Sequence, residues 1–179
     1  KARSLYLYGQ EINLSTYAIA KINMFLHGLD SADIQRGDTL ADPKFLNPDG
    51  SLKTFDICVA NPPYSVSEWE YEKFKSDKHG RITGYEMPPA KKADYAFVLH
   101  MIKSMNENGR AGIVLPHGVL FRGGAEGRIR EQFIKNDLIE AIIALPSKLF
   151  YGTGIPAAIV IFNKNKPEDH KNKIIIIDA

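Results

Sequence analysis

Apolar residues along this chain follow two patterns that alternate with each other. Apolar runs typical of buried strands lie at 54–60, 111–116, 138–146, 157–164 and 172–179, and strand-like stretches that end in polar or turn residues lie at 4–11 and 32–40. Apolar positions spaced three and four residues apart predict helices over 14–27 and 95–109, and a third after a glycine-rich loop within 118–136. Apolar strands that alternate with helices predict an α/β fold of three layers with a mostly parallel sheet buried on both faces.

Cap and turn residues support the boundaries of these helices. Asn13 is the predicted N-cap of the first helix, and Gly28 stands where its C-terminal cap is expected. Asp94 is the predicted N-cap of the second helix, which Asn108 and Gly109 would end. The apolar side chains expected to share one helix face are Leu14, Ala18, Ile22, Phe25 and Leu26 in the first helix and Ile129, Phe133 and Ile134 in the third.

Composition narrows the class of protein. A length of 179 residues with 44% hydrophobic residues suits one domain with a real core, and no apolar run is long enough to span a membrane. The single cysteine, Cys58, excludes a disulfide framework and is expected to pack as a small hydrophobic residue in a reducing, cytoplasmic compartment. The five histidines show no metal-ligand spacing, so we expect no metal. A net charge of +2 means that any contact with DNA is local or shared with a partner.

Polar residues stand directly after several predicted strands, where α/β sheets bind their ligands. They include Glu11, Asp38 with Thr39, and Asn61. A carboxylate in this position commonly accepts both hydroxyls of a ribose, which suits Glu11, and Asp38 or its neighbours could accept from an adenine amino group. An acidic residue after a strand is also common in ordinary turns, so either carboxylate alone is weak evidence.

The Asn-Pro-Pro-Tyr segment at 61–64 is more informative. Each proline fixes its own φ angle and keeps the preceding residue extended, so the segment is stiff before any ligand binds. Pro62 and Pro63 carry no N–H group, so the segment presents acceptors, namely the Asn61 side-chain oxygen and the Pro62 carbonyl. Two rigid acceptors suit a planar NH2 group with two hydrogens, and Tyr64 can offer its ring for stacking.

At this point the chain resembles a known family. NPPY is the signature of S-adenosylmethionine-dependent methyltransferases that act on exocyclic or amide nitrogens. Three longer stretches, GYEMPPAKKADYAFVLHMI, GRAGIVLPHGVLFRGGAEGRIRE and LIEAIIALPSKLFYGTGIPAAIVIFNK, are similar in content and order to the modification subunit of type I restriction-modification systems. The resemblance covers nearly the whole chain and implies an adenine-N6 DNA methyltransferase with a Rossmann-like fold.

The chain departs from that family in several parts, because the family's N-terminal helical region, first strand with the following helix, and C-terminal tail have no counterpart in it. It contains no glycine-rich cofactor loop of the form D-x-x-x-G-S/T-G, and it does not begin with Met. We therefore expect residues 1–179 to be a partial methyltransferase catalytic domain that starts just before the second strand of the fold and is incomplete at its N-terminal end. A sheet without its central strand would expose unpaired edges, so we expect the isolated chain to self-associate and to lack activity.

The resemblance implies a role for each residue at the strand ends. Asn61 and Pro62 would accept from the adenine amino group, Pro63 would stiffen the segment, and Tyr64 and Phe150 would stack on the flipped base. Phe150 could equally be a core aromatic residue. S-adenosylmethionine would be the cofactor. The residues expected to hold it are Glu11 with Ile12 at the ribose, Asp38 with Thr39 at the adenine, and Asn61.

The resemblance also implies partners. They are double-stranded DNA with a flipped adenine, the specificity and restriction subunits of a type I complex, and a second copy of the modification subunit, with no membrane. Arg122, Arg128 and Arg130 are candidates for DNA phosphate contacts, although ordinary surface arginines would give the same pattern. The long polar connection at 65–92 is expected to be locally structured or functional, as a flap that faces DNA or another subunit.

Two alternatives remain open. One is another NPPY methyltransferase, which acts on a protein glutamine or on ribosomal RNA. The other is an inactive fragment that is kept for assembly with other subunits.

Overall fold

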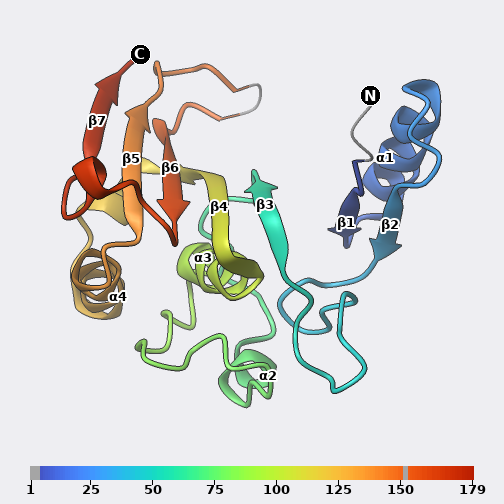
Figure 1. Ribbon diagram of the computed structural model, residues 1–179, viewed down its shortest axis with the longest axis horizontal. Coiled ribbons are helices and arrows are strands. Elements are labelled where there is room, and N and C mark those ends of the chain that lie inside the picture. The colour runs from blue at the N-terminus through green and yellow to red at the C-terminus, as the bar shows by residue number, and fades with distance from the viewer. Residues whose placement is uncertain (1–4, 151–152) are drawn as a thin grey trace. The chain divides into compact units, whose positions relative to one another are not determined.

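The computed structural model describes residues 5–150 and 153–179, which divide into two compact units at 1–52 and 53–179 (Figure 1). Each unit has a sheet of its own. The first holds a two-stranded sheet, β1–β2, and the second holds a five-stranded sheet in the order β3-β4-β6-β5-β7. The predicted alternation of strands and helices is confirmed.

The first unit is a β–α–β element. It consists of β1 (Tyr8–Glu11), α1 (Leu14–Leu26) and β2 (Asp33–Arg36), and its two strands pair in parallel. The predicted N-cap is confirmed, because the Asn13 side chain accepts from the N–H groups of Ser15 and Thr16. Gly28, just past the helix, has φ +67, a conformation that glycine adopts without strain.

The apolar face of α1 is exposed within its own unit. No residue of the helix is buried among the described residues, and Ile22, Phe25 and Leu26 are all exposed. The apolar side chains predicted to share one face of this helix are present, but residues 5–52 do not bury them.

The second unit is built around a mixed sheet. Its elements are β3 (Phe55–Ala60), α2 (Tyr71–Lys75), α3 (Asp94–Lys103), β4 (Met105–Pro116), the 3-10 helix η1 (His117–Leu120), α4 (Gly124–Lys135), β5 (Ile139–Ala144), β6 (Ala157–Asn163), the 3-10 helix η2 (Glu168–His170) and β7 (Ile175–Asp178). β3 pairs in parallel with β4, and β5 with β7, whereas β6 runs antiparallel to both of its neighbours. The other four strands share one direction, so the sheet is mostly parallel as predicted.

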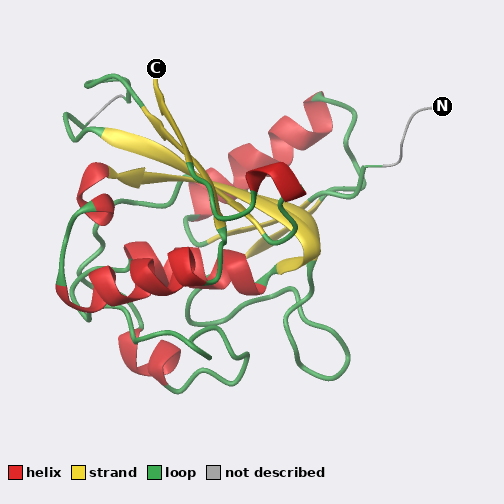
Figure 2. Ribbon diagram, turned by 60° about the vertical axis from the view of Figure 1, so that its left-hand side comes forward, coloured by secondary structure: helices red, strands yellow, loops and turns green. Residues whose placement is uncertain are grey.

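The core of this unit lies between one face of the sheet and the helices α3 and α4, which pack on the same side (Figure 2). Phe133 of α4 is fully buried and meets the rings of Tyr95 on α3 and Phe162 on β6 at centroid distances of 5.9 and 5.4 Å. Ile129 is buried as predicted. Ile134 was expected to face inward, but it is 53% exposed because it follows Phe133 at the outer margin of the helix.

Burial of the strands on both faces was expected, but among the described residues neither β7, whose four residues are all exposed, nor β3 shows it. Ile57 and Val59 on this edge strand are exposed. Cys58 between them is half-buried, and burial raises the pKa of its thiol to about 11. The cysteine therefore packs as a small side chain, as predicted.

The second helix is shorter than the sequence indicated. α3 ends at Lys103, and Met105 already belongs to β4, where it pairs with Phe55. Long-range pairing with β3 and burial of the Met105 side chain outweigh the local helix signal. Asn106 then accepts from the N–H of Asn108, and this local turn accompanies the register shift in the ladder.

The long connection at 65–92 is structured, as expected. It contains α2, whose Phe74 is fully buried, and the guanidinium of Arg81 lies 4.3 Å from the centre of that ring. Arg81 and Asp77 form a buried ion pair with 2.8 Å between nitrogen and oxygen. The Arg81 guanidinium also lies 3.5 Å from Nδ1 of His100 on α3, which ties the connection to that helix.

We predict that His100 makes this fold sensitive to mild acid. Burial, aided by the charge of Arg81, lowers the pKa of His100 to about 3, whereas an unfolded histidine titrates near about 6.5. Below that pH the unfolded chain binds a proton that the folded chain does not. The contribution of His100 to the free energy of unfolding should therefore be complete above about pH 6.5. On acidification below that pH it should fall, by at most about 1.4 kcal/mol per pH unit.

Urea unfolding between about pH 7 and pH 5 measures this slope before most carboxylates titrate. His100→Gln should flatten the slope, and His27→Gln, at an exposed histidine after α1, serves as the control. An equal slope in the parent and in His100→Gln would contradict the prediction.

Candidate active site

The Asn-Pro-Pro-Tyr segment begins where β3 ends. Ala60, the last residue of β3, pairs with Ile113 of β4, so Asn61 leaves the sheet at its carboxyl edge. Asn61 and Pro63 are exposed, whereas Pro62 is buried and anchors the segment. Tyr64 is half-buried, and burial raises the pKa of its hydroxyl, so the ring is neutral at physiological pH.

A cleft of about 490 Å³ opens on this segment. Its walls are Asn61, Pro62, Pro63, Tyr64, Phe150, Thr153 and Ile155. Phe150 comes from the segment between β5 and β6, far from Tyr64 in sequence, and the fold brings the two predicted stacking residues to one cleft. The volume is within the range of small-molecule pockets and suits a planar base.

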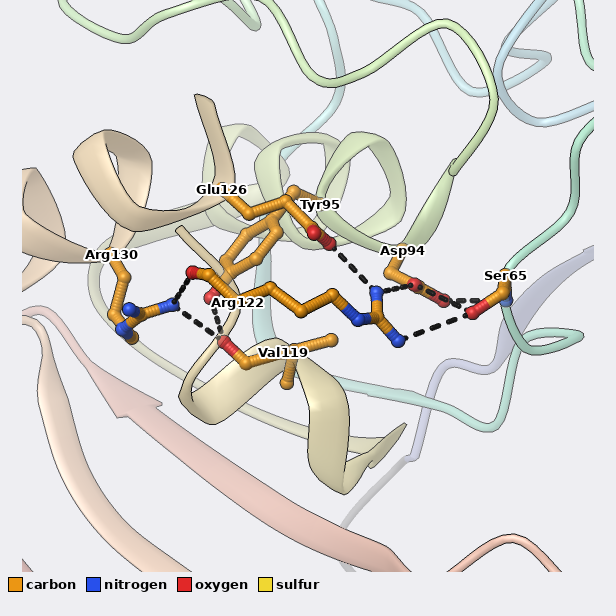
Figure 3. Close-up of polar contacts among 7 residues, drawn as sticks. All are labelled: Ser65, Asp94, Tyr95, Val119, Arg122, Glu126 and Arg130. Carbon is orange, nitrogen blue, oxygen red and sulfur yellow. Dashed lines mark hydrogen bonds and ion pairs between the residues drawn. The ribbon is translucent and has the colours of Figure 1, made fainter. Parts of the chain in front are cut away.

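The chain turns sharply after Tyr64 and is held there by a buried carboxylate. Ser65 has φ +51, which a residue with a side chain rarely adopts. Its N–H donates to Asp94 Oδ1 at 2.7 Å, and its hydroxyl donates to Asp94 Oδ2 at 3.2 Å (Figure 3). Asp94 was predicted to cap α3; instead Ala93 is the N-cap residue and no side chain caps it, because the Asp94 carboxylate is engaged with Ser65 and with an arginine.

That arginine is Arg122, which lies between η1 and α4. Its Nη1 donates to Asp94 Oδ2 at 3.0 Å and to Glu126 Oε1 at 2.9 Å, and both carboxylates are buried. Burial alone would lower the pKa of Arg122, but bonds and charges from Asp94 and Glu126 raise the pKa above its usual value. Gly118 leaves room for the guanidinium, since a Cβ there would lie 2.4 Å from the Arg122 Nε and Nη2 atoms.

The backbone that carries Arg122 is itself braced. Arg130 Nη1 donates to the carbonyls of Val119 and Arg122 at 2.8 and 3.1 Å, and the Tyr95 hydroxyl donates to the same Val119 carbonyl at 2.7 Å (Figure 3). Arg128 points elsewhere and forms a bidentate pair with Glu86. The three arginines considered for DNA phosphate thus all have protein partners, and a contact with DNA stays a prediction.

The predicted cofactor residues divide between the two units, because Asn61 belongs to the second unit and the others to the first. Glu11 is the last residue of β1 and Asp38 comes shortly after its partner strand β2, and the Gly37 N–H donates to the Glu11 carbonyl at 3.0 Å. One oxygen of each carboxylate is used locally: Glu11 accepts from the Asn13 N–H, and Asp38 accepts from the N–H groups of Leu40 and Ala41. Ile12 is exposed and Thr39 is half-buried.

Two further observations concern the described residues only. No group of three or more His, Cys, Asp or Glu side chains among them could hold a metal ion. No helix in this part of the chain is long and apolar enough to cross a membrane.

Comparison with known proteins assigns the chain to one family. Residues 1–179 match the family model described as N-6 DNA Methylase. The methylase subunit of a type I restriction enzyme from Methanocaldococcus jannaschii is 41% identical over 184 residues, which cover 98% of this chain and 30% of the relative. The methylase subunit of another such enzyme, from Haemophilus influenzae, is 36% identical. The matched residues cover 97% of this chain and 37% of that relative.

A solved structure has the same fold. The methyltransferase subunit of a type I restriction-modification system from Streptococcus thermophilus superimposes with a TM-score of 0.85 at 32% identity, covering 99% of this chain and 42% of that one. The chain thus spans 30–37% of the length of the two curated relatives.

We predict that Tyr95→Phe lowers the free energy of unfolding by about 1 kcal/mol, because it removes one buried hydrogen bond. The loss stays modest because the Val119 carbonyl keeps its bond from Arg130. Urea unfolding measures the change. The control is Tyr71→Phe, at a half-buried tyrosine that begins α2. Equal stability of Tyr95→Phe and the parent would contradict the role of this hydroxyl as a brace.

Proposed function

This chain belongs to the N-6 DNA methylase family, and from that premise we propose that it forms the target-binding part of a DNA adenine-N6 methyltransferase. The whole subunit would transfer a methyl group from S-adenosylmethionine to N6 of an adenine flipped out of the duplex. The cleft at Asn61–Tyr64 is the observation that carries this proposal. The matched relatives are methylase subunits of restriction enzymes, which favours DNA over a protein glutamine or ribosomal RNA.

The geometry of the cleft fits an amino group attached to a flat ring. Asn61 and Pro62 both line the cleft, Asn61 as an exposed residue and Pro62 as a buried one. Asn61 Oδ1 and the Pro62 carbonyl would each accept one N6 hydrogen. Tyr64 and Phe150 line the same cleft and would cover the faces of the base, which repays part of the cost of unstacking it.

The two acceptors would also make the adenine N6 nitrogen more reactive. The N6 lone pair of adenine is delocalised into the ring, so the nitrogen is a poor nucleophile. Acceptors on both hydrogens favour a pyramidal nitrogen and stabilise the positive charge that develops as the N–C bond forms. When bound, S-adenosylmethionine supplies the electrophilic methyl group, and the nitrogen loses one of its hydrogens as a proton once it has been methylated.

The first unit suits part of the cofactor. The local bonds of Glu11 and Asp38 fix both side chains, and Glu11 Oε2 and Asp38 Oδ2 have no hydrogen-bond partner among the described residues. Two oriented carboxylates at the carboxyl edge of parallel strands suit a ribose diol and an adenine amino group. Ile12 and Thr39 would flank the nucleoside. No metal takes part in this proposal.

Partners follow from the same family. We assign the whole subunit to a cytoplasmic type I complex with double-stranded DNA, specificity and restriction subunits and a second modification subunit. The modest net charge of +2 agrees with DNA reading by a separate specificity subunit.

Asn61→Ala should abolish methylation of DNA, with a fall of about 100-fold or more in rate, because one of the two acceptors is lost. The assay follows label from S-adenosylmethionine into DNA in a complete subunit with its specificity partner, and digestion identifies N6-methyladenine. Asn165→Ala, in an exposed turn after β6, is the control. Label on RNA or protein in place of DNA would overturn the proposed substrate.

Glu11→Ala should weaken binding of S-adenosylmethionine by about 10-fold or more, because a charged acceptor is lost. Calorimetry on the complete subunit measures the affinity. Asp33→Asn, at an exposed carboxylate at the start of β2, should bind normally. Unchanged affinity in Glu11→Ala would remove the ribose role.

A further inference from the structure

We propose that Asp94, clamped by Arg122, is a positioning residue for the acceptors of the Asn61–Tyr64 segment. This inference rests on the proposed function and extends it to residues outside the cleft. Asp94 holds the backbone directly after Tyr64, so it fixes the exit of the segment in the way that β3 fixes its start.

The backbone conformation of Ser65 has to be held in place by a neighbouring group. A side chain at φ +51 stores strain, and the conformation persists only where surrounding groups hold it. Asp94 holds it through two hydrogen bonds, one to the backbone N–H and one to the hydroxyl. If these bonds are lost, Ser65 can relax toward negative φ, and the preceding Tyr64 and Pro63 turn with it.

The carboxylate in turn needs Arg122. Asp94 is 1% exposed, and a buried charge is tolerated only when it is paired and hydrogen-bonded. Arg122 supplies the opposite charge and places Nη2 3.4 Å from the Ser65 hydroxyl, and its Nη1, which donates to Asp94, also donates to Glu126. Arg130 and Tyr95 hold the backbone that carries Arg122, so α3, η1 and α4 together fix the guanidinium that pairs with Asp94 (Figure 3).

This role differs from phosphate binding in its measurable effects. A phosphate contact would weaken DNA binding for all sequences and reduce the salt dependence of affinity by about one charge when lost. A positioning role affects the chemical step, because a small displacement of aligned groups costs about 10- to 100-fold in rate while the binding surfaces persist.

The test uses a complete subunit with its specificity partner and measures three quantities. These are the single-turnover rate of methyl transfer at saturating cofactor, the cofactor affinity, and the DNA affinity at several salt concentrations. Asp94→Asn should lower the rate by about 10-fold or more, with both affinities and the salt slope unchanged within about twofold.

Gly118→Ala gives an independent variant that removes no charge. The new Cβ would meet the Arg122 guanidinium, and the φ angle of Gly118 lies outside the positive range, so the backbone accepts alanine. Its rate should fall in the same way as in Asp94→Asn. Asp77→Asn is the matched control, because it weakens another ion pair with a buried carboxylate, that with Arg81, and both of its residues belong to the 65–92 connection. It should lower the melting temperature and leave the rate unchanged.

Several outcomes would overturn the proposal. A normal rate in folded Asp94→Asn and Gly118→Ala is one, and a reduced salt slope in Gly118→Ala, which would assign Arg122 to phosphate, is another. An equal loss of rate in Asp77→Asn would show a general effect of stability. If Asp94→Asn does not fold, Gly118→Ala decides. Absence of DNA methylation in the parent complex would contradict the proposed function itself.

Discussion

A carboxylate that is withdrawn from water must find donors, and in this chain Asp94 finds them on two segments that are far away in sequence. Ser65 and Arg122 are its partners, at 2.7 Å from the Ser65 nitrogen and 3.0 Å from the Arg122 guanidinium. Removing one partner of such a buried pair typically costs about 3–5 kcal/mol, so the pair is not freely broken. The helices of the second unit and the edge of the candidate site are therefore coupled through one charge pair.

The segment between these anchors is stiff for a second reason. Pro62 and Pro63 restrict φ at their own positions and ψ at the residues before them, while Asn61 continues directly from β3. Little conformational entropy remains to be lost when a ligand binds, and this is the condition under which two acceptors can be aimed at one amino group. On this account the cleft is prepared by the fold rather than by the substrate.

Local signals in the sequence predicted much of this structure. The Asn13 cap, Gly28 and the positions of the strands depend on neighbours within a few residues, and the pattern shows them directly. The Asn-Pro-Pro-Tyr segment was identified because proline restricts the backbone wherever it stands. The meeting of Tyr64 and Phe150 in one cleft was anticipated through the resemblance, since nothing local connects them.

Features that depend on distant partners were missed. α3 stops at Lys103 because Met105 pairs with Phe55, and no residue near Met105 signals that pairing. Asp94 carries an N-cap signal, yet its partners are Ser65 and Arg122, 29 and 28 residues away. The left-handed Ser65 has no signal at all, because glycine or asparagine would be the expected residue there. Gly118, which makes room for Arg122, was a hint of a partly buried guanidinium.

The most direct measurement is a structure of the complete subunit with its specificity partner, target DNA and a non-reactive analogue of S-adenosylmethionine. The account predicts a flipped adenine in the cleft, with N6 about 3 Å from both Asn61 Oδ1 and the Pro62 carbonyl and with Ser65 still bonded to Asp94. A flipped adenine whose amino group is held by other residues, or an Asn61–Tyr64 segment that rearranges on binding, would contradict it.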